Sequence, residues 1–281
     1  MFPAMRSPYV FFHLPHLVAA GSWHMAADRQ LLQWVSQSSS RLVFRTYAWD
    51  RPTLSLGRSE PYPEGWDESA LARAGIAVVR RPTGGNAVLH VEEVTFALAA
   101  SIPGPWELTP RGFANAAAEA LSEALAACGV PGSLARDVPP SAGPVRRPAA
   151  GALCFARTAP GEVEAAGYKV AGIASRFGRK GALCHASVPL TARSREVAAF
   201  RSEIRAEAEA LDRHARSVGE LLGLGPGPAG ADRALALGAV LAAALAGALA
   251  SRFGARQADA SFAVLGIEEG SPTAAATPAL A

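Results

Sequence analysis

Short apolar runs in the first hundred residues predict an amino-terminal part that is rich in β-strands. The runs are either continuously apolar or alternate between apolar and polar residues, a period of two that is typical of strands. They comprise residues 10–17, 41–49, 52–58, 76–79, 87–90 and 94–101. The last of these runs has small and apolar residues throughout, so we expect it to be buried on both faces of a sheet.

Helical spacing of apolar residues appears between and after these runs. Residues 23–35 show it first, with Ser22 as the expected N-cap. Residues 66–74 and 113–128 show it again, and each of these two segments is followed by a glycine, the residue that most often ends a helix. Strands and helices therefore alternate along this part of the chain.

The middle of the chain combines a long loop with two hairpins. Residues 137–151 contain four prolines and two glycines. A loop of this length is uncommon in compact domains and is either functional or disordered. Residues 162–176 fold back at a turn over 165–167, and a second hairpin turns at 178–181. From 194 to 224 the period becomes helical again.

The carboxy-terminal region has a different composition. Residues 225–230 are a Gly/Pro linker, and 232–252 form a helix of Ala and Leu. Its uncharged part, 234–250, falls short of the roughly 18 residues that span a membrane, so we expect the helix to dock against the domain. The Ala/Thr/Pro-rich end is expected to be disordered. The expected division is a folded domain, a linker with a helix, and a tail, over residues 1–224, 225–256 and 257–281.

Composition and charge exclude several classes of protein. The chain has 281 residues, 50% of them apolar, and a net charge of +3. No block of Lys and Arg marks a nucleic-acid surface, so we expect no nucleic-acid partner. The three cysteines lie far apart without metal-ligand spacing, which favours reduced thiols, no metal site and a cytoplasmic protein. Prolines interrupt the apolar start, so we expect neither a signal peptide nor a membrane partner.

Residues 80–90 carry the first candidate for chemistry. Two arginines, a Pro-Thr turn and a glycine pair follow a strand, and together they offer charge, exposed amides and close approach to an anionic or acyl ligand. An ordinary surface turn with solvated arginines has the same composition. P-loop, dinucleotide-binding and Gly-x-Ser-x-Gly motifs are absent from the sequence, which disfavours nucleotide hydrolysis, Rossmann enzymes and serine hydrolases.

Cys154 and Lys169 form the second candidate. Cys154 follows the long loop, and the hairpin over 162–176 can bring Lys169 back toward it. An ammonium group beside a cysteine stabilises its thiolate, which can carry an acyl group as a thioester. On spacing alone, a buried cysteine and a solvated lysine remain the simpler interpretation. Cys184 and His185 are consecutive in a strand and point to opposite faces, so they do not form a Cys-His pair.

Three separated segments, taken together, resemble one family. Residues 52–58, residues 80–90, and residues 167–176 with 180–187 resemble the biotin/lipoate protein ligase catalytic domain, in its lipoate ligase and octanoyltransferase branch. The resemblance covers roughly residues 10–220. It implies an α/β (α+β) fold in which a mixed β-sheet with flanking helices lines a tunnel for an acyl chain.

The resemblance also implies roles for individual residues. Cys154 would be the nucleophile and Lys169 would polarise the acyl carbonyl. The residues implied to bind the substrate are Arg80, Arg81, Thr83, Gly84, Gly85, His90, Gly172 and His185. The sequence departs from the family pattern at Glu60, Asn86, Val91 and Ala186. Val91 stands where an Asp often follows the histidine, which puts the hydrogen bonding of His90 in doubt, and Ala186 narrows the backbone where Gly is usual.

The function implied by the resemblance is transfer of an octanoyl or lipoyl group to a lysine of a lipoyl carrier domain, without a cofactor. The donor would be octanoyl-acyl carrier protein, and the acceptors would be the lipoyl domains of 2-oxoacid dehydrogenases or an H-type protein of glycine cleavage. Such partners are acidic, which suits the positive net charge. Two alternatives remain: an ATP- and Mg-dependent lipoate ligase in which Cys154 is structural, and a non-catalytic acyl-binding paralogue.

Overall fold

A mixed β-sheet forms the centre of the protein. The computed structural model describes residues 9–102, 109–135, 153–201, 204–254 and 256–266. The main sheet has the order β11-β12-β7-β3-β1-β13, with β2 also paired to β3. β11, β12, β7 and β3 pair antiparallel, whereas β1 is parallel to both β3 and β13. Its strands are β1 (Val10–His13), β2 (Leu17–Ala19), β3 (Arg41–Trp49), β7 (Glu93–Ser101), β11 (Gly172–Phe177), β12 (Gly181–Pro189) and β13 (Arg256–Asp259).

Two small sheets flank one end of the main sheet. In the first, β4 (Thr53–Leu56) pairs in parallel with β5 (Ala77–Arg80) and antiparallel with β6 (Val88–His90). In the second, β9 (Val163–Ala165) lies between β8 (Ser133–Leu134) and β10 (Tyr168–Lys169). The segment 80–90 therefore connects two strands that both neighbour β4, and Lys169 ends the hairpin strand β10.

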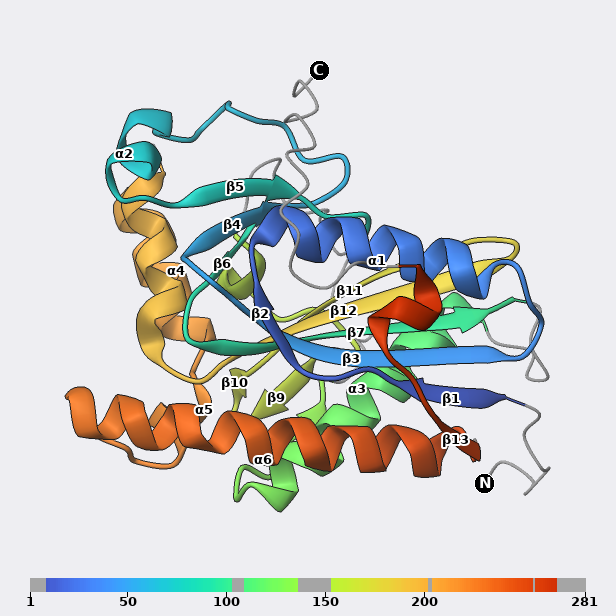
Figure 1. Ribbon diagram of the computed structural model, residues 1–281. Helices are drawn as coiled ribbons and strands as arrows, with labels where there is room; N and C mark the ends of the chain where they lie inside the picture. Colours follow the sequence, from blue (N-terminus) through green and yellow to red (C-terminus); the bar gives the residue numbers. More distant parts are fainter. Residues whose placement is uncertain (1–8, 103–108, 136–152, 202–203, 255, 267–281) are drawn as a thin grey trace, which may run out of the picture.

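Helices cover both faces of the main sheet (Figure 1). α1 (Gly21–Val35) covers one face, and α3 (Pro110–Ala127) and α6 (Pro228–Arg252) cover the other. Because side chains alternate along a strand, β7 serves both cores: Ala97 packs in the cluster with Leu31 of α1, and Leu98 in the cluster with Leu245 of α6. The other helices within the described residues are α2 (Glu68–Arg73), α4 (Ile204–His214), α5 (Val218–Leu221) and the 3₁₀ turns η2 (Cys154–Ala156), η3 (Ala192–Phe200) and η4 (Phe262–Leu265).

The expected mixed α/β fold is confirmed, and β3 and the fully buried β7 match their predicted runs closely. Other boundaries are wrong. The first helix starts at Gly21 with Ala20 as its N-cap, so Ser22 lies inside it. The predicted first strand is two strands, β1 and β2, separated at Leu14-Pro15-His16, because a proline cannot donate to the ladder. The helical segment after 194 consists of η3, α4 and α5.

The carboxy-terminal region also corrects a prediction. α6 begins at Pro228, inside the expected linker. The expected disorder from residue 257 is wrong up to Leu265, because β13 pairs in parallel with β1 through its backbone and η4 follows. The composition of this Ala-rich segment did not indicate a strand, because β13 is held by backbone hydrogen bonds rather than by a pattern of apolar side chains. Residues 267–281, like the long loop over 137–151, lie outside the described residues.

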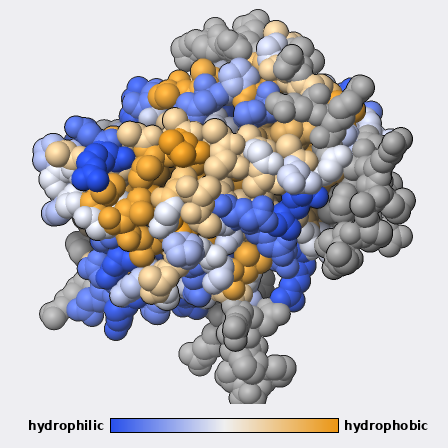
Figure 2. Space-filling model, turned by 90° about the horizontal axis from the view of Figure 1, so that it is seen from below, coloured by the Kyte–Doolittle hydropathy of each residue, from blue (hydrophilic) through white to orange (hydrophobic). Residues whose placement is uncertain are grey.

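α6 docks on the sheet and still exposes apolar side chains. Leu241, Leu245 and Leu249 are buried in the core shared with α3. Leu235 and Val240 point outward, 41% and 52% exposed. Figure 2, which views the molecule from the side of α6, shows hydrophobic residues gathered on this face. Among the described residues, α6 is the one helix that is long and apolar enough to span a membrane. Core helices of soluble proteins can have the same length and composition.

Candidate active site

The β9–β10 hairpin brings Lys169 to Cys154. Ala166 and Gly167 adopt positive φ angles of 51° and 80° at its turn, which reverses the chain. Lys169 Nζ lies 3.7 Å from Cys154 Sγ. It also donates to the carbonyl oxygen of Cys154 at 2.7 Å and contacts Glu162 Oε2 at 2.7 Å. The pair that sequence spacing left undecided is therefore in contact.

The environment of Lys169 keeps its side chain protonated. The residue is only 1% exposed, and this burial alone would lower its pKa. The negative charges of the Cys154 thiolate and of Glu162 outweigh burial, so the pKa of Lys169 is raised above its usual value. An ammonium group held in this way can stabilise a thiolate or a developing oxyanion, but it cannot take up a proton at neutral pH.

Cys154 opens into a cavity between the main sheet and the small β4–β5–β6 sheet. The cavity volume is about 30 Å³, so the space is narrow and an acyl chain would enter it only if the lining side chains move apart. Met25, Val88, Ile173 and Ala174 give it apolar walls, and its polar lining includes Cys154, Ser55, Arg81, His90 and His185. Gly172 lies beside the thiol: a Cβ atom there would be 3.1 Å from Cys154 Sγ. An apolar space that ends at a thiol suits an acyl chain with an activated carbonyl. Lys169 contacts that thiol but is not among the described residues that line the cavity.

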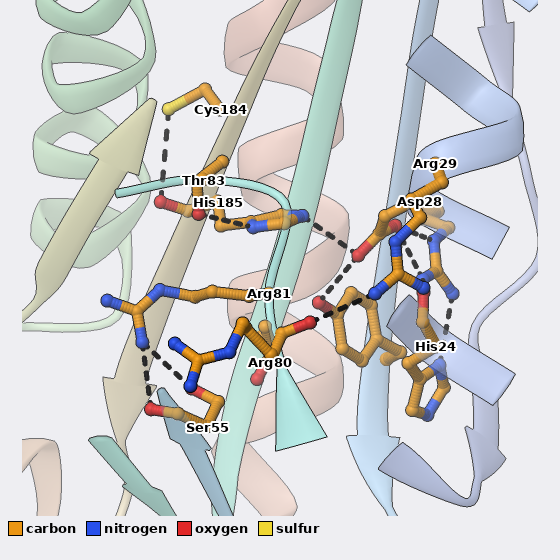
Figure 3. A network of polar contacts seen from close by, with 12 residues as sticks. His24, Asp28, Arg29, Ser55, Arg80, Arg81, Thr83, Cys184 and His185 are labelled. Atoms are coloured by element: carbon orange, nitrogen blue, oxygen red, sulfur yellow. Dashed lines mark hydrogen bonds and ion pairs between the residues drawn. The ribbon is translucent and has the colours of Figure 1, made fainter. Parts of the chain in front are cut away.

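Arg81 holds the glycine-rich loop in place. Its guanidinium donates to the carbonyl oxygens of Gly84 and Asn86 at 2.8 and 2.7 Å, and to the carbonyl and hydroxyl oxygens of Ser55 at 2.9 and 3.1 Å. Burial lowers the pKa of Arg81, and the neighbouring Cys154 charge opposes that effect. Arg81 lines the cavity, and its hydrogen bonds define the shape of the loop. Figure 3 shows its contact with Ser55.

The other residues of the loop are placed differently from the expectation. Arg80 donates to the carbonyl oxygens of Gly57 and Glu60, and it is not among the described residues that line the cavity. Neither are Gly84 and Gly85 among those lining residues. A Cβ atom on Gly57 would lie 1.8 Å from the Gly85 carbonyl oxygen, so the loop packs directly on the end of β4. A substrate-binding role for Arg80, Gly84 and Gly85 stays a prediction.

His90 is held by a carboxylate that sequence reasoning missed. Its Nδ1 lies 2.7 Å from Glu93 Oε1, and its Nε2 lies 2.7 Å from Ser55 Oγ. Its ring stacks on Trp49 with 4.0 Å between centroids. Burial acts to raise the pKa of Glu93, but His90 and the hydroxyl groups of Thr95 and Ser187 lower it overall. Glu93 thus supplies the acceptor that was in doubt because Val91 replaces an Asp.

His185 belongs to a second buried network. Its Nδ1 lies 3.0 Å from Thr83 Oγ1, and its Nε2 lies 2.8 Å from Asp28 Oδ2. Asp28 pairs with Arg45 at 2.6 Å, both side chains fully buried. Burial alone would raise the pKa of Asp28, but Arg45 and His185 lower it. Figure 3 shows this chain of contacts from α1 to the loop, which connects the glycine-rich segment to the sheet.

The side chain of Cys184 lies on the opposite face of β12 from the His185 ring, as expected from their neighbouring positions, and its thiol contacts the His185 backbone carbonyl oxygen at 3.9 Å (Figure 3). Its thiol is fully buried in the core, where burial raises its pKa to about 12. Cys128 caps α3 and packs partly against the same core. Among the described residues, no group of three or more His, Cys, Asp or Glu side chains could hold a metal ion. Cys154 is thus the one described thiol that lines the cavity.

Sequence reasoning missed Asp28, Arg45, Ser55, Glu93 and Glu162. Two of them had a usable signal: Glu93 lies three residues after His90, and Ser55 lies within the segment 52–58 that carries the family resemblance. Asp28 and Arg45 come from α1 and β3, and no local spacing joins them to His185. The departures Asn86 and Ala186 are accommodated: Asn86 binds Arg81 through its backbone, and Ala186 lines the cavity opposite Ile173.

The mixed sheet and its cavity define the lipoate ligase type of fold. A crystal structure of lipoate-protein ligase A bound with ATP superposes with a TM-score of 0.63 at 16% identity, covering 90% of this chain and 89% of that chain. A bipartite lipoate protein ligase from Thermoplasma acidophilum also gives 0.63 at 16% identity, over 90% of this chain and 88% of that chain. The chain belongs to the lipoyl protein ligase A/B catalytic domain family, whose model matches residues 21–229.

Two relatives found by sequence similarity have names that specify an activity. Octanoyltransferase LipM of Carboxydothermus hydrogenoformans is 44% identical over 92 residues, 33% of this chain and 34% of the relative. Octanoyltransferase LipM of Kyrpidia tusciae is 34% identical over 175 residues, 61% of this chain and 62% of the relative. The chain therefore aligns with less than two thirds of the length of either relative.

Proposed function

We propose that this protein is an octanoyltransferase that moves an octanoyl group from acyl carrier protein to a lysine of a lipoyl domain through a thioester on Cys154. The observation that carries the proposal is the contact of Lys169 Nζ with Cys154 Sγ, 3.7 Å apart at the wall of an apolar cavity. The similarity to octanoyltransferases named LipM supports it.

The first half-reaction transfers the acyl group to the enzyme. The Cys154 thiolate attacks the thioester carbonyl of the loaded carrier protein, the new C–S bond forms, and the carrier thiolate leaves. Lys169 stabilises the attacking thiolate and can donate a hydrogen bond to the carbonyl oxygen as negative charge develops there. The apolar walls around Val88, Ile173 and Ala174 would hold the acyl chain.

The second half-reaction transfers the acyl group to a lysine amine, and Cys154 leaves as a thiolate. The transfer needs no cofactor, because the donor thioester already activates the acyl group. The proposed partners are octanoyl-acyl carrier protein and the lipoyl domains of 2-oxoacid dehydrogenases or an H-type protein. Acidic carriers suit the net charge of +3. A cytoplasmic location stays a prediction from the unpaired cysteines.

An ATP-dependent lipoate ligase is the second candidate, because the ATP-bound lipoate-protein ligase A has the same fold. In that reaction ATP and Mg would activate the acyl group as an adenylate, and Cys154 would be structural. The two candidates differ in their need for the thiol.

Intact mass spectrometry after incubation with octanoyl-loaded carrier protein tests the proposal. We expect one octanoyl adduct on the wild-type chain and on Cys128→Ser, and none on Cys154→Ser. Cys128 caps α3 through its backbone N–H and is not among the described residues that line the cavity. ATP-dependent lipoylation that survives in Cys154→Ser would establish the ligase instead. If the wild-type chain forms no adduct and catalyses no lipoylation, the remaining interpretation is a non-catalytic acyl-binding protein.

A further inference from the structure

We propose that Glu93 makes the cavity selective for an unsubstituted hydrocarbon chain, because it binds polar hydrogens of the side chains that line the cavity. This inference rests on the proposed octanoyl transfer and names the class of acyl group that the site accepts. Glu93 itself is not among the described residues that line the cavity. It acts from behind the wall, as a specificity-determining residue and not as a catalytic one.

The wall of the cavity contains many polar side chains for a site that holds an alkyl chain. Besides Cys154, eight of the lining residues described have polar side chains. A polar hydrogen that pointed into the cavity would lose its partner when an alkyl chain replaced water there, which is unfavourable. The acceptors to which these hydrogens are directed therefore decide what the cavity can bind.

Glu93 accepts from four of these side chains. Its Oε1 atom lies 2.7 Å from His90 Nδ1 and 3.3 Å from Trp49 Nε1. The Thr95 hydroxyl donates to the same oxygen, and the Ser187 hydroxyl donates to Oε2. A hydroxyl carries a single hydrogen, so neither Thr95 nor Ser187 has one left for a ligand. Burial would raise the pKa of Glu93, but these contacts lower it overall, so the carboxylate stays an acceptor at neutral pH.

Other polar side chains of the wall are also satisfied within the protein. Tyr47 donates to Oδ2 of the buried Asp28 at 3.1 Å, and His185 Nε2 contacts the same oxygen at 2.8 Å. The guanidinium of Arg81 makes five hydrogen bonds, as many as it has N–H groups, to oxygen atoms of Ser55 and of the glycine-rich loop.

The Ser55 hydroxyl depends on Glu93 through His90. Nδ1 of His90 donates to Glu93, so Nε2 of the neutral ring accepts the hydrogen of the Ser55 hydroxyl, 2.7 Å away. Each polar hydrogen of the eight side chains then has an acceptor in the protein. These side chains offer no free hydrogen-bond donor to a ligand, and an alkyl chain meets them as an apolar surface.

The register of the strands places the Glu93 contacts along a path that starts at the thiol. A Cβ atom on Gly172 would lie 3.1 Å from Cys154 Sγ. Gly172 pairs with Ser187 on β12, and Ser187 pairs with Thr95 on β7. Two strand spacings make this row about 10 Å long. An octanoyl chain has a similar length, since its seven C–C bonds of about 1.5 Å reach roughly 9 Å when extended. A chain on Cys154 that follows this row passes Ser187 near its middle.

Two acyl probes of equal length test the proposal. They are the N-acetylcysteamine thioesters of octanoic acid and of 5-oxaoctanoic acid, in which an ether oxygen replaces one methylene group. The rates of adduct formation on Cys154 are compared by intact mass spectrometry. An ether oxygen needs a hydrogen-bond donor, so we expect the wild-type chain to prefer octanoyl by about 10- to 100-fold.

Glu93→Gln should weaken this preference. Three donors face Oε1, so the amide oxygen takes that position and the NH₂ group faces Ser187. The Ser187 oxygen then accepts from the amide, and its hydrogen turns toward the cavity. We expect the preference for octanoyl to fall by at least about fivefold. Glu92→Gln is the matched control, because it changes the neighbouring carboxylate, which pairs with Arg193, and it should match the wild-type chain.

Ser187 provides a second comparison. Ser187→Ala should keep the wild-type preference, because the hydrogen of its hydroxyl is directed at Glu93. The double variant Glu93→Gln/Ser187→Ala should recover the preference that Glu93→Gln loses. If Glu93→Gln slows both probes equally and leaves the preference unchanged, its role is structural and the inference is overturned. A stronger preference for octanoyl in Ser187→Ala would also overturn it, and this comparison decides alone if Glu93→Gln does not fold.

Failure of the proposed transfer can be distinguished from failure of this inference. If the wild-type chain forms no adduct with either probe or with octanoyl-loaded carrier protein, the transfer is refuted. Calorimetry with octanoic acid and 5-oxaoctanoic acid then tests the cavity directly. A preference for octanoic acid that is weaker in Glu93→Gln than in the wild-type chain would support the inference, and equal preferences would overturn it.

Discussion

The Sγ atom of Cys154 lies 3.1 Å from the position that a Cβ atom on Gly172 would occupy. A Gly172→Ala substitution should therefore push the thiol away from Lys169. The thiol must then shift by a few tenths of an ångström, and we expect the rate of octanoyl-adduct formation to fall by up to about 10-fold, because reaction rates are sensitive to the position of the attacking atom. Gly247→Ala is the matched control, since a Cβ there would meet no described atom within 4 Å. Equal rates in the two variants would contradict the close contact.

Glu162 helps to keep the pKa of Lys169 above its usual value of 10.5. A raised pKa contributes stability that is present below pH 10.5 and is lost as the pH rises through the higher value in the folded protein. In Glu162→Gln one of the raising charges is gone, so less stability should be lost above pH 10.5. Urea unfolding of the wild-type chain and Glu162→Gln between pH 9 and pH 12 would show this difference. If the unfolding free energies of the two proteins change with pH in parallel, the prediction is refuted.

Asp28 and Arg45 form a buried ion pair whose loss on one side should be costly. Arg45→Met leaves the Asp28 carboxylate buried without its cation, and we expect a loss of about 3–5 kcal/mol in the free energy of unfolding. The double variant Arg45→Met/Asp28→Leu should recover part of it. Urea unfolding at pH 7 measures both, and a double variant weaker than the single one would contradict this account.

Lowering the pH should remove the stabilisation that the ionised Asp28 carboxylate contributes. Because the pKa of Asp28 is lowered in the folded state, its contribution is present above its unfolded value of 3.8 and is lost as the pH falls below it. The stability difference between the wild-type chain and the double variant should therefore shrink between pH 4 and pH 2. A constant difference over that range would show that Asp28 does not titrate with unfolding.

Because α6 docks on the sheet, we expect substitutions of two of its leucines to change the free energy of unfolding by different amounts. Leu245 is fully buried, so Leu245→Ala should cost about 2–5 kcal/mol of unfolding free energy. Leu235 is 41% exposed, and Leu235→Ala should change it by less than about 1 kcal/mol. Thermal or urea unfolding distinguishes them. Similar values for the two would mean that α6 does not pack on the sheet in solution.

Continuously apolar runs predicted the strands that pack on both faces, because burial on both faces excludes polar side chains from either side of the strand. Run 94–101 shows this best, since every position of β7 is buried. The same signal failed at 168–176, where β10 passes into β11 through Val170 and Ala171 and the two strands join different sheets. Both halves of that run mix apolar and polar residues in a strand-like way, and only their pairing in the folded protein separates them.

Some residues of the candidate site could likewise be predicted from the sequence, and others could not. Residues within one motif, such as Arg81 and His90, could be found from the sequence through the family resemblance. Asp28 could not, because one carboxylate on an amphipathic helix has the same appearance whether it meets solvent or His185. Glu162 was assigned only to a hairpin strand. Its contact with Lys169 depends on how that hairpin folds back.

The pairing of β13 with β1 has a consequence for solubility. Without β13, the outer edge of β1 would present unpaired backbone groups, which are a template for association between chains. β13 is only four residues long, so the edge that it offers in turn is short. A chain that ends at residue 254 should therefore self-associate more readily, which light scattering during refolding would detect.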